Sequence, residues 1–307
     1  MTVFVAGGSG TIGRPLVRAL VAAGHHVVAT TRSPAKRDRI ARLGAEPVTV
    51  DALDAPALAR AVSAASPTHV VHQLTALPAA GPRSDAELAQ TNRLREEGTR
   101  NLLRAAQSAG ARRFIVGSFA PLTASSSSPG ALAPSSAAAR AAQSMERQAL
   151  DAARAGAIEA VVLRYGLFYG ADVPSTSEML ALVRRRRLPA LRADRGRLPF
   201  VHLDDAVAAT VAALDRGASG GIYHIVDDRP VSFSEFVRAM ADIGEAPTPF
   251  AIPRWLMRLA APYMARMLEQ DMCLSNADAR RELRWEPAYP TCRDGIRQVI
   301  AEARRAQ

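Results

Sequence analysis

Lysine is almost absent from this sequence. Lys36 is the only lysine, so 38 of the 39 Lys and Arg residues are arginine, and the formal net charge is +10. Nucleic-acid binding would need a recognisable reading element, or aromatic residues among the basic ones, and we find neither. The basic balance therefore favours ligands that carry phosphate or carboxylate groups, although genome composition also explains arginine enrichment.

Cysteine and long apolar segments are also scarce. Cys273 and Cys292 have neither the spacing of a metal site nor a disulfide framework around them, so we expect no bound metal and a reducing, cytoplasmic setting. No apolar run reaches the length of a membrane span. The chain enters a strand within two residues, so we expect no signal peptide. With 48% hydrophobic and 22% charged residues, the 307-residue chain has the composition of a globular protein.

A glycine turn near the start is the most informative stretch. The run Val3–Ala6 leads into glycines spaced three residues apart, and the helical pattern Arg14–Ala23 follows at once. Glycine permits a tight turn, a close approach of the backbone to a pyrophosphate, and close packing of the helix on the strand. The helix N-terminus favours phosphate. An ordinary glycine turn is the alternative, but in this context we predict dinucleotide binding by Gly7, Gly10, Thr11, Ile12 and Gly13.

Strand and helix patterns alternate through the first half of the chain. The short apolar runs lack polar alternation, which predicts parallel strands covered on both faces. The predicted fold class is α/β, a doubly wound parallel sheet with its ligand crevice at the carboxyl ends of the strands. The predicted strands are Val3–Ala6, Val27–Thr31, Pro47–Val50, His69–His72 and Arg113–Gly117, and the predicted helices are Arg14–Ala23, Pro34–Leu43, Ala55–Ala64 and Asp85–Ala109.

The end of the second strand distinguishes NADP from NAD. An NAD site usually has an Asp or Glu there, about 20 residues past the glycines, to bind the ribose 2′-hydroxyl. No acidic residue occurs between Gly13 and Asp38. Arg32 instead offers a guanidinium suited to a 2′-phosphate, and Lys36 is close enough to assist. We predict NADP as the cofactor, with NAD and a mere surface arginine as the alternative.

Two aspartates follow the third strand. Asp51 can accept a hydrogen bond from an adenine amino group, whereas Asp54 has the position of a helix N-cap. We assign Asp51 to the cofactor site and Asp54 to the helix. We also place Ala52 and Leu74 in the cofactor site, each just past the end of a strand.

The segments that carry a family resemblance are Gly7–Gly13, Asp51, Val70–His72, Phe114–Ser118, Leu163–Gly170 and Phe200–Asp205. With these the sequence resembles the extended short-chain dehydrogenase/reductases, the NAD-dependent epimerase/dehydratase family, over nearly its whole length. The resemblance implies a Rossmann domain of residues 1–170 and 198–228. It also implies a smaller, mostly helical substrate domain of residues 171–197 and 229–307. In this family, helices equivalent to 85–109 and 137–155 commonly form a dimer bundle, so a homodimer is expected as a possibility.

The catalytic part of the family pattern is missing. The pattern implies a Tyr-x-x-x-Lys pair on the helix that begins near residue 137, in which the lysine lowers the pKa of the tyrosine. Those positions hold Ala138 and Ala142. No tyrosine precedes Tyr165 and no lysine follows Lys36, so no shift of the alignment restores the pair. This member is therefore atypical.

Another group must move a proton, or no such transfer occurs. A phenol with a pKa of about 10 is a poor base unless a cation lowers that pKa. The family's catalytic Ser or Thr falls near Ser118 or Phe119, which leaves Ser118 as one candidate. Tyr169 is the second, although it belongs to the Tyr-Gly turn usual for this fold. Tyr165 and His72 are further candidates, but His72 ends an apolar strand, which is more typical of a structural imidazole.

Two later segments are candidates for substrate contact. The loop 120–137 is rich in Ser, Ala and Pro and is either a lid that orders on ligand binding or a tolerated long loop. The run Trp255–Ala260, together with Tyr263, Met264 and Met267, is apolar at helical spacing. Core packing explains most of it, and the remainder can line an apolar substrate pocket.

These observations predict an NADP-binding oxidoreductase, reductase- or epimerase-like, that acts on a small carbonyl or hydroxyl substrate with a non-standard catalytic set. One alternative is a non-redox isomerase, cyclase or dehydratase on the same scaffold. The other is a non-catalytic regulator that senses NADP. We expect a small-molecule substrate and neither a nucleic-acid nor a membrane partner.

Overall fold

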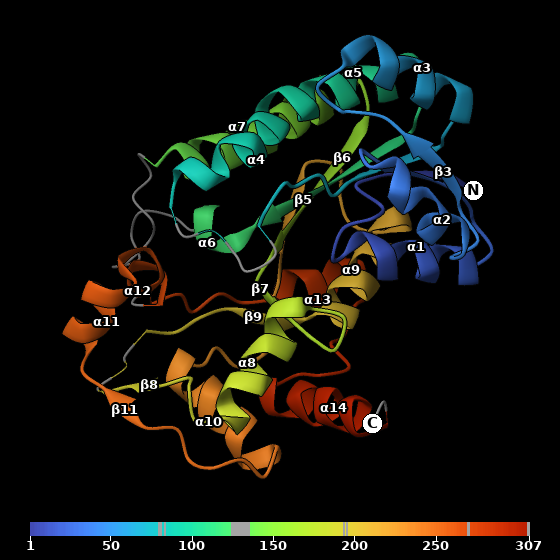
Figure 1. Ribbon diagram of the computed structural model, residues 1–307. Helices are drawn as coiled ribbons and strands as arrows, with labels where there is room; N and C mark the ends of the chain where they lie inside the picture. The colour runs from blue at the N-terminus through green and yellow to red at the C-terminus, as the bar shows by residue number, and fades with distance from the viewer. Residues whose placement is uncertain are drawn as a thin grey trace.

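Seven parallel strands form the central sheet (Figure 1). The computed structural model describes residues 1–78, 82, 84–123, 136–192, 194, 196–268 and 271–305. The strand order β10-β6-β5-β4-β1-β2-β3 runs outward in both directions from β1 and β4, which confirms the doubly wound fold. The strands are β1 (Thr2–Ala6), β2 (His26–Thr31), β3 (Glu46–Thr49), β4 (His69–His72), β5 (Arg113–Phe119), β6 (Glu159–Tyr165) and β10 (Gly221–Ile225).

Helices cover both faces of this sheet, as its uninterrupted apolar strands require. Each face has its own buried cluster, with Leu102 and Met145 in one and Leu16 and Leu214 in the other. The first face carries α3 (Ala55–Ala65), α5 (Thr99–Ser108) and α7 (Ala137–Arg154), and the second carries α1 (Gly13–Ala22), α9 (Leu203–Asp215) and α13 (Ala277–Leu283). The segment after β2 forms a 3₁₀ turn, Pro34–Lys36, and α2 (Arg37–Ala41).

The segment before α5 is irregular. The sequence predicts one helix over Asp85–Ala109, and this is wrong at its centre. The chain forms a 3₁₀ turn at Ala86–Leu88, α4 (Ala89–Arg93) and a π-helical turn at Leu94–Gly98 before α5 begins. A π turn adds a residue to the helical repeat and changes which side chains face inward, and such turns are frequent at functional sites.

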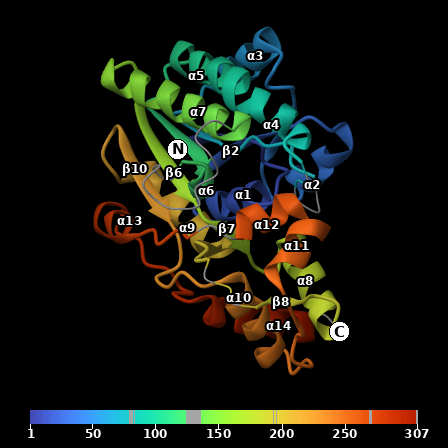
Figure 2. The same ribbon diagram turned by 90° about the vertical axis from the view of Figure 1, so that its left-hand side faces the viewer.

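The remaining elements build a C-terminal part around its own core (Figure 2). Tyr169, Phe200 and Phe236 are central to that core. Its helices are α8 (Pro174–Arg184), α10 (Phe233–Ile243), α11 (Arg254–Ala260), α12 (Pro262–Leu268) and α14 (Cys292–Arg305), and its strand pairs are β7 (Leu167–Tyr169) with β9 (Phe200–His202) and β8 (Ala190–Leu191) with β11 (Ala251–Ile252). In the described part of the chain, no helix has both the length and the apolar character to cross a membrane.

The sequence pattern predicts one helix over Arg254–Leu268 and an N-cap at Asp204 or Asp205 for the helix that follows them, and both predictions are wrong. The apolar run 254–268 is not one helix but two, because Pro262 disfavours a helical conformation at Ala261, whose φ is −146°. The N-cap of α9 is His202 rather than Asp204 or Asp205, since the Nδ1 atom of His202 accepts a hydrogen bond from the Asp204 N–H. The Asp205 carboxylate instead accepts backbone N–H bonds from residues 288 and 289.

Candidate functional site

The turn between β1 and α1 accepts glycine and little else. Gly7 has a φ of +94°, which L side chains avoid. A Cβ atom at Gly7 would lie 2.6 Å from the backbone oxygen of Gln73, and one at Gly13 would lie 2.1 Å from the oxygen of Gly7. The close contact at Gly13 brings the start of α1 against the turn. Backbone this tightly drawn against a helix N-terminus fits the diphosphate of a nicotinamide dinucleotide.

Thr11 and Ile12 complete this turn. Thr11 is half-buried and Ile12 is buried beneath the turn, directly before α1 begins. The Gly7 N–H donates to the Oγ1 atom of Thr30 at 3.1 Å, and the Gly10 N–H donates to the Gly7 oxygen at 3.0 Å. The first bond links the turn to β2, and the second closes the turn itself. The cofactor contacts of the individual turn residues stay predictions.

Arg32 and Lys36 lie together beyond the end of β2. Both side chains are exposed, and within the described chain neither has an ion-pair partner. Asp51 is also exposed and accepts a 3.0 Å bond from the Leu53 N–H. Asp54 caps α3 through a 3.0 Å bond from the Ala57 N–H, as the sequence predicts. The contribution of Arg32, Lys36 and Asp51 to cofactor binding stays a prediction.

Ala52 and Leu74 pack on the same face of the sheet. Ala52 is buried and Leu74 is half-buried in the cluster beneath α3 and α5. The Leu74 N–H donates to the Nδ1 atom of His72 at 3.2 Å, and the Nε2 atom of His72 lies 2.8 Å from the Thr99 Oγ1. Burial lowers the pKa of His72 to about 4. This imidazole is therefore neutral and structural, which matches the simpler interpretation of the sequence.

The positions of the family's catalytic groups form an apolar cluster. Ala138 and Ala142 are 3% and 0% exposed, and they pack with Leu88. Phe119, from the end of β5, and Tyr263, from α12, pack against the same cluster. The two positions at which the resemblance implies a phenol and an amine thus lie in one cluster with Phe119, and both carry only a methyl group.

The Ser118 side chain is hydrogen-bonded to a buried carboxylate. Its Oγ donates to the Oε1 atom of Glu146 at 2.6 Å. Arg164 holds the same carboxylate with its Nε at 3.1 Å and its Nη2 at 2.7 Å from the two oxygens. Ser118 and Glu146 are 5% and 3% exposed. This charged, bidentate arrangement links β5, β6 and α7. The Ser118 hydroxyl takes part in it, and a catalytic role for Ser118 stays a prediction.

Tyr169 belongs to the core of the C-terminal part rather than to the clusters that cover the central sheet. It is fully buried in the C-terminal core, and its hydroxyl donates to the Asp227 Oδ2 at 3.0 Å. Burial and the Asp227 charge raise the pKa of Tyr169 far above its usual range. Tyr165 is buried as well, with its hydroxyl 2.7 Å from the Thr210 Oγ1, and burial raises its pKa to about 12. Neither phenol is placed to exchange protons readily, and the catalytic role predicted for Tyr169 stays untested.

Arg95 is a buried cation that no sequence motif indicates. It lies in the π turn and is only 7% exposed, with one hydrogen bond, from its Nη1 to the Asn92 Oδ1 at 3.3 Å. Burial lowers the pKa of its guanidinium to about 10. Burial also lowers the pKa of His72 and raises that of Tyr263, and the Arg95 charge is a smaller influence on both groups. Helical spacing from Thr91 would have placed it on the buried face.

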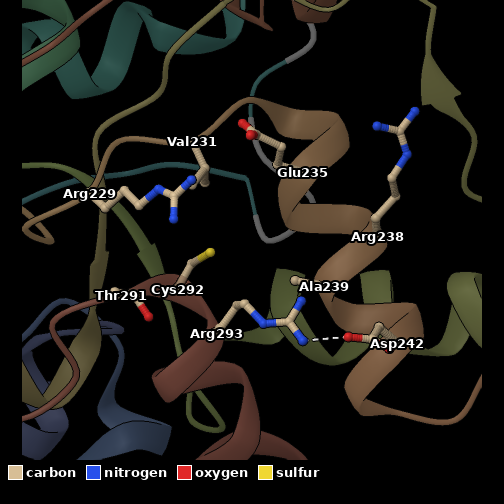
Figure 3. Close-up of a pocket in the computed structure, with 9 residues that line it drawn as sticks. All are labelled: Arg229, Val231, Glu235, Arg238, Ala239, Asp242, Thr291, Cys292 and Arg293. Carbon is tan, nitrogen blue, oxygen red and sulfur yellow. Dashed lines mark hydrogen bonds and ion pairs between the residues drawn. The ribbon is translucent and has the colours of Figure 1, made fainter.

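A separate cavity of about 430 Å³ lies in the C-terminal part (Figure 3). Burial raises the pKa of the Cys292 thiol to about 11, so this thiol stays protonated. Arg293 pairs with Asp242 across one side of the cavity. The lining residues are Arg229, Val231, Glu235, Arg238, Ala239, Asp242, Thr291, Cys292 and Arg293, and none of them comes from the central sheet. This cavity is therefore distinct from the dinucleotide site.

The predicted lid, the loop 120–137, falls mostly outside the described residues. Residues 124–135 are not among them. The described start of this loop, Ala120–Thr123, forms the short helix α6 directly after β5.

Comparison with known proteins connects this geometry to reductases. Residues 3–226 match the NAD-dependent epimerase/dehydratase family. A 3-diazoavenalumate denitrifying reductase from a Streptomyces species is 37% identical over 96% of this chain and 99% of its own. A 4-hydroxy-2-methyl-3-oxo-4-farnesyl-3,4-dihydroquinoline-1-oxide ketoreductase from Stigmatella aurantiaca is 26% identical over 92% of this chain and 91% of its own.

Solved structures show the same fold. The UDP-glucose 4-epimerase of Thermus thermophilus in complex with NAD is 23% identical, covers 100% of both chains and superposes with a TM-score of 0.80. The dTDP-glucose 4,6-dehydratase of Streptomyces venezuelae with NAD is 22% identical, covers 99% of this chain and 97% of its own, and has a TM-score of 0.79. The protein described here is an oxidoreductase of the short-chain dehydrogenase/reductase type that uses a nicotinamide cofactor. The chain belongs to the NAD-dependent epimerase/dehydratase family.

Proposed function

We propose that this protein is an NADP-dependent reductase that removes nitrogen from a diazo compound by hydride transfer, without proton transfer from a Tyr–Lys pair. The observation that carries the proposal is the apolar cluster at Phe119, Ala138 and Ala142. The relative that is 37% identical over nearly the full length is named for a denitrifying reduction of a diazo compound. The cluster explains why that chemistry suits this chain better than carbonyl reduction.

The two reactions differ in their need for an acid. A ketone that accepts a hydride becomes an alkoxide, which must be protonated, and a positioned acid contributes about 10²–10⁴-fold to such a step. A diazonium group already carries a positive charge. The bound nicotinamide would supply the hydride, and R–N₂⁺ + NADPH → R–H + N₂ + NADP⁺ balances with no proton given or taken by the protein. In this reaction the carbon–nitrogen bond breaks, N₂ leaves, and hydrogen takes its place on carbon.

The apolar cluster has a second use in this reaction. Diazonium groups are strong electrophiles, and water competes for them. Methyl groups at Ala138 and Ala142 and the ring of Phe119 offer water no hydrogen-bonding partner, so this apolar cluster helps to exclude water.

The residues that would hold the cofactor are the turn Gly7–Gly13, with α1 behind it, and the two cations Arg32 and Lys36 after β2.

The NADP preference rests on Arg32 and Lys36. Both are exposed and without an acidic partner in the part of the chain that the structure describes, and a guanidinium binds phosphate in a bidentate manner. We expect NADPH to bind at least about tenfold more tightly than NADH, a difference of about 1.4 kcal/mol. Fluorescence titration measures both affinities. Arg32→Ala should remove most of the preference, whereas Arg42→Ala, a nearby exposed arginine outside the site, should preserve it.

Turnover tests the reaction itself. Purified protein is mixed with NADPH and 4-carboxybenzenediazonium without oxygen, and NADPH oxidation, benzoate and N₂ are followed against a protein-free control that corrects for direct reduction. Equal amounts of all three above the control support the proposal. NADPH oxidation with a carbonyl panel but not with the diazonium salt would make the protein a ketoreductase. Tight NADPH binding without any turnover would instead favour a regulator.

A further inference from the structure

Arg95 is a buried cation near the apolar cluster, and no acidic partner for it occurs in the part of the chain that the structure describes. The Arg95 side chain has five N–H donors, but its only hydrogen bond to a described residue is the 3.3 Å contact with Asn92 on the preceding helical turn. Within the described ranges no carboxylate pairs with it. The neighbouring arginine on the same segment, Arg93, is exposed and forms an ion pair with Glu97 at 3.0 Å. Of these two neighbouring arginines, Arg95 is therefore the one that is buried and has no carboxylate partner among the described residues.

The guanidinium lies where the two parts of the molecule meet. Arg95 belongs to the π turn that packs against α7, the helix that bears Ala138 and Ala142. Its charge acts on His72 at the end of β4 and on Tyr263 of α12. Both ribbon views place α12 near the end of α7 that carries these alanines (Figures 1 and 2). Arg95 thus lies at the carboxyl edge of the sheet, where a doubly wound fold binds its ligands.

An unpaired buried charge is costly, because desolvation disfavours the charged form. Proteins retain such a group when a ligand completes its hydrogen bonds. We propose that Arg95 binds an anionic oxygen group of the substrate, such as a carboxylate, and that Tyr263, from the C-terminal part of the molecule, forms one wall of this site. An oxyanion at Arg95 would also neutralise the cation of a diazonium substrate, so the bound pair would carry no net charge. The diazo part of this reasoning rests on the proposed function, whereas the anion site does not.

The test measures binding rather than turnover. Isothermal titration of the protein in the presence of saturating NADP⁺ compares benzoate with benzamide, which has the same shape but no charge. We expect benzoate to bind about tenfold more tightly, since hydrogen bonds between two charged groups are the stronger kind. Arg95→Met should abolish that preference, and Arg95→Lys should restore part of it. Arg93→Met is the matched control and should keep it.

Three outcomes overturn the proposal. They are equal binding of benzoate and benzamide by the wild-type protein, an unchanged benzoate preference in Arg95→Met, and a loss of NADPH affinity in Arg95→Met, which would assign Arg95 to the cofactor instead. Because the assay involves no reduction, a protein that binds benzoate through Arg95 but leaves diazonium salts untouched would keep the anion site and refute only the diazo reaction.

Discussion

The Oγ atom of Ser118 donates a 2.6 Å hydrogen bond to the Oε1 atom of Glu146. This bond decides how the family's serine position is used here. The hydroxyl that would face a substrate is held by a buried carboxylate, which Arg164 neutralises from the other side. The helix that supplies Glu146 carries alanine at the family's lysine position one turn earlier and at its tyrosine position two turns earlier. The contacts of Glu146 therefore join β5, β6 and α7.

Ser118→Ala should lower stability more than activity. Losing a hydrogen bond to a charged group costs about 1.5–3 kcal/mol, which denaturant unfolding will show. The fall in kcat/KM should be much smaller than the 10²–10⁴-fold that loss of an acid–base group causes. Ser108→Ala, an exposed change at the end of α5, is the control and should alter neither quantity. A large loss of kcat with unchanged stability would make Ser118 catalytic after all.

Restoring the family pair should not restore carbonyl chemistry. The double variant Ala138→Tyr with Ala142→Lys inserts two large side chains at positions that are 3% and 0% exposed. Overpacking costs about 1–3 kcal/mol at each site, and the new ammonium would lie in an apolar cluster. We expect a lower melting temperature and no ketone reduction. Ala137→Tyr, at an exposed position of α7, should be tolerated. A double variant that is as stable as wild type and reduces ketones would show that the cluster has room for both larger side chains.

Acid should weaken the fold through His72. Burial lowers its folded-state pKa to about 4, below the usual 6.5, so the unfolded chain binds the proton more readily. The stability contributed by the neutral imidazole is present above pH 6.5 and is lost as the pH falls toward 4. Between pH 7 and pH 5 the loss amounts to about 2 kcal/mol. Urea unfolding at the two pH values should show this drop, and it should shrink in His72→Asn. An equal drop in both proteins would show that His72 is not the group responsible for the loss of stability in acid.

The sequence predicts the dinucleotide half of the site because its signals are local. The strand, the glycine spacing and the first turn of α1 lie within about a dozen residues, and Gly7 and Gly13 have the close contacts that the spacing implies. Asp54 as an N-cap is a three-residue pattern and is likewise confirmed. The absence of the Tyr–Lys pair is also legible in the sequence alone, because no other Tyr or Lys is near enough to replace it.

The substrate half depends on long-range packing. Tyr263 reaches the cluster at Ala138 from 125 positions away in the chain, and no periodicity links the two. Helical spacing from Thr91 places Arg95 on the buried face, but a 3.6-residue repeat predicts neither the π turn at Leu94–Gly98 nor the contact with α12. Asp205 illustrates the same limit, since its position suggests a cap, whereas its carboxylate binds the backbone at residues 288 and 289.

Arg95→Met should make the ligand-free protein more stable. The wild-type guanidinium is buried without an acid, and replacing a buried charge by an apolar side chain of similar length is often stabilising. A gain of about 1 kcal/mol corresponds to a few degrees in melting temperature for a chain of this size. Benzoate should then raise the melting temperature of the wild-type protein but not that of the variant. A strongly destabilised Arg95→Met would show that the guanidinium serves the fold.

The stoichiometry of NADPH, N₂ and product tests the central claim most directly. In a sealed vessel the wild-type protein, supplied with NADPH and 4-carboxybenzenediazonium, should release one N₂ and one benzoate for each NADPH oxidised above the protein-free rate. That rate should not depend on an ionising group between pH 6 and pH 9, because the protein contributes no proton. Reduction of ketones in place of the diazonium salt, with a bell-shaped pH profile, would contradict the claim and point to an acid–base group elsewhere in the site.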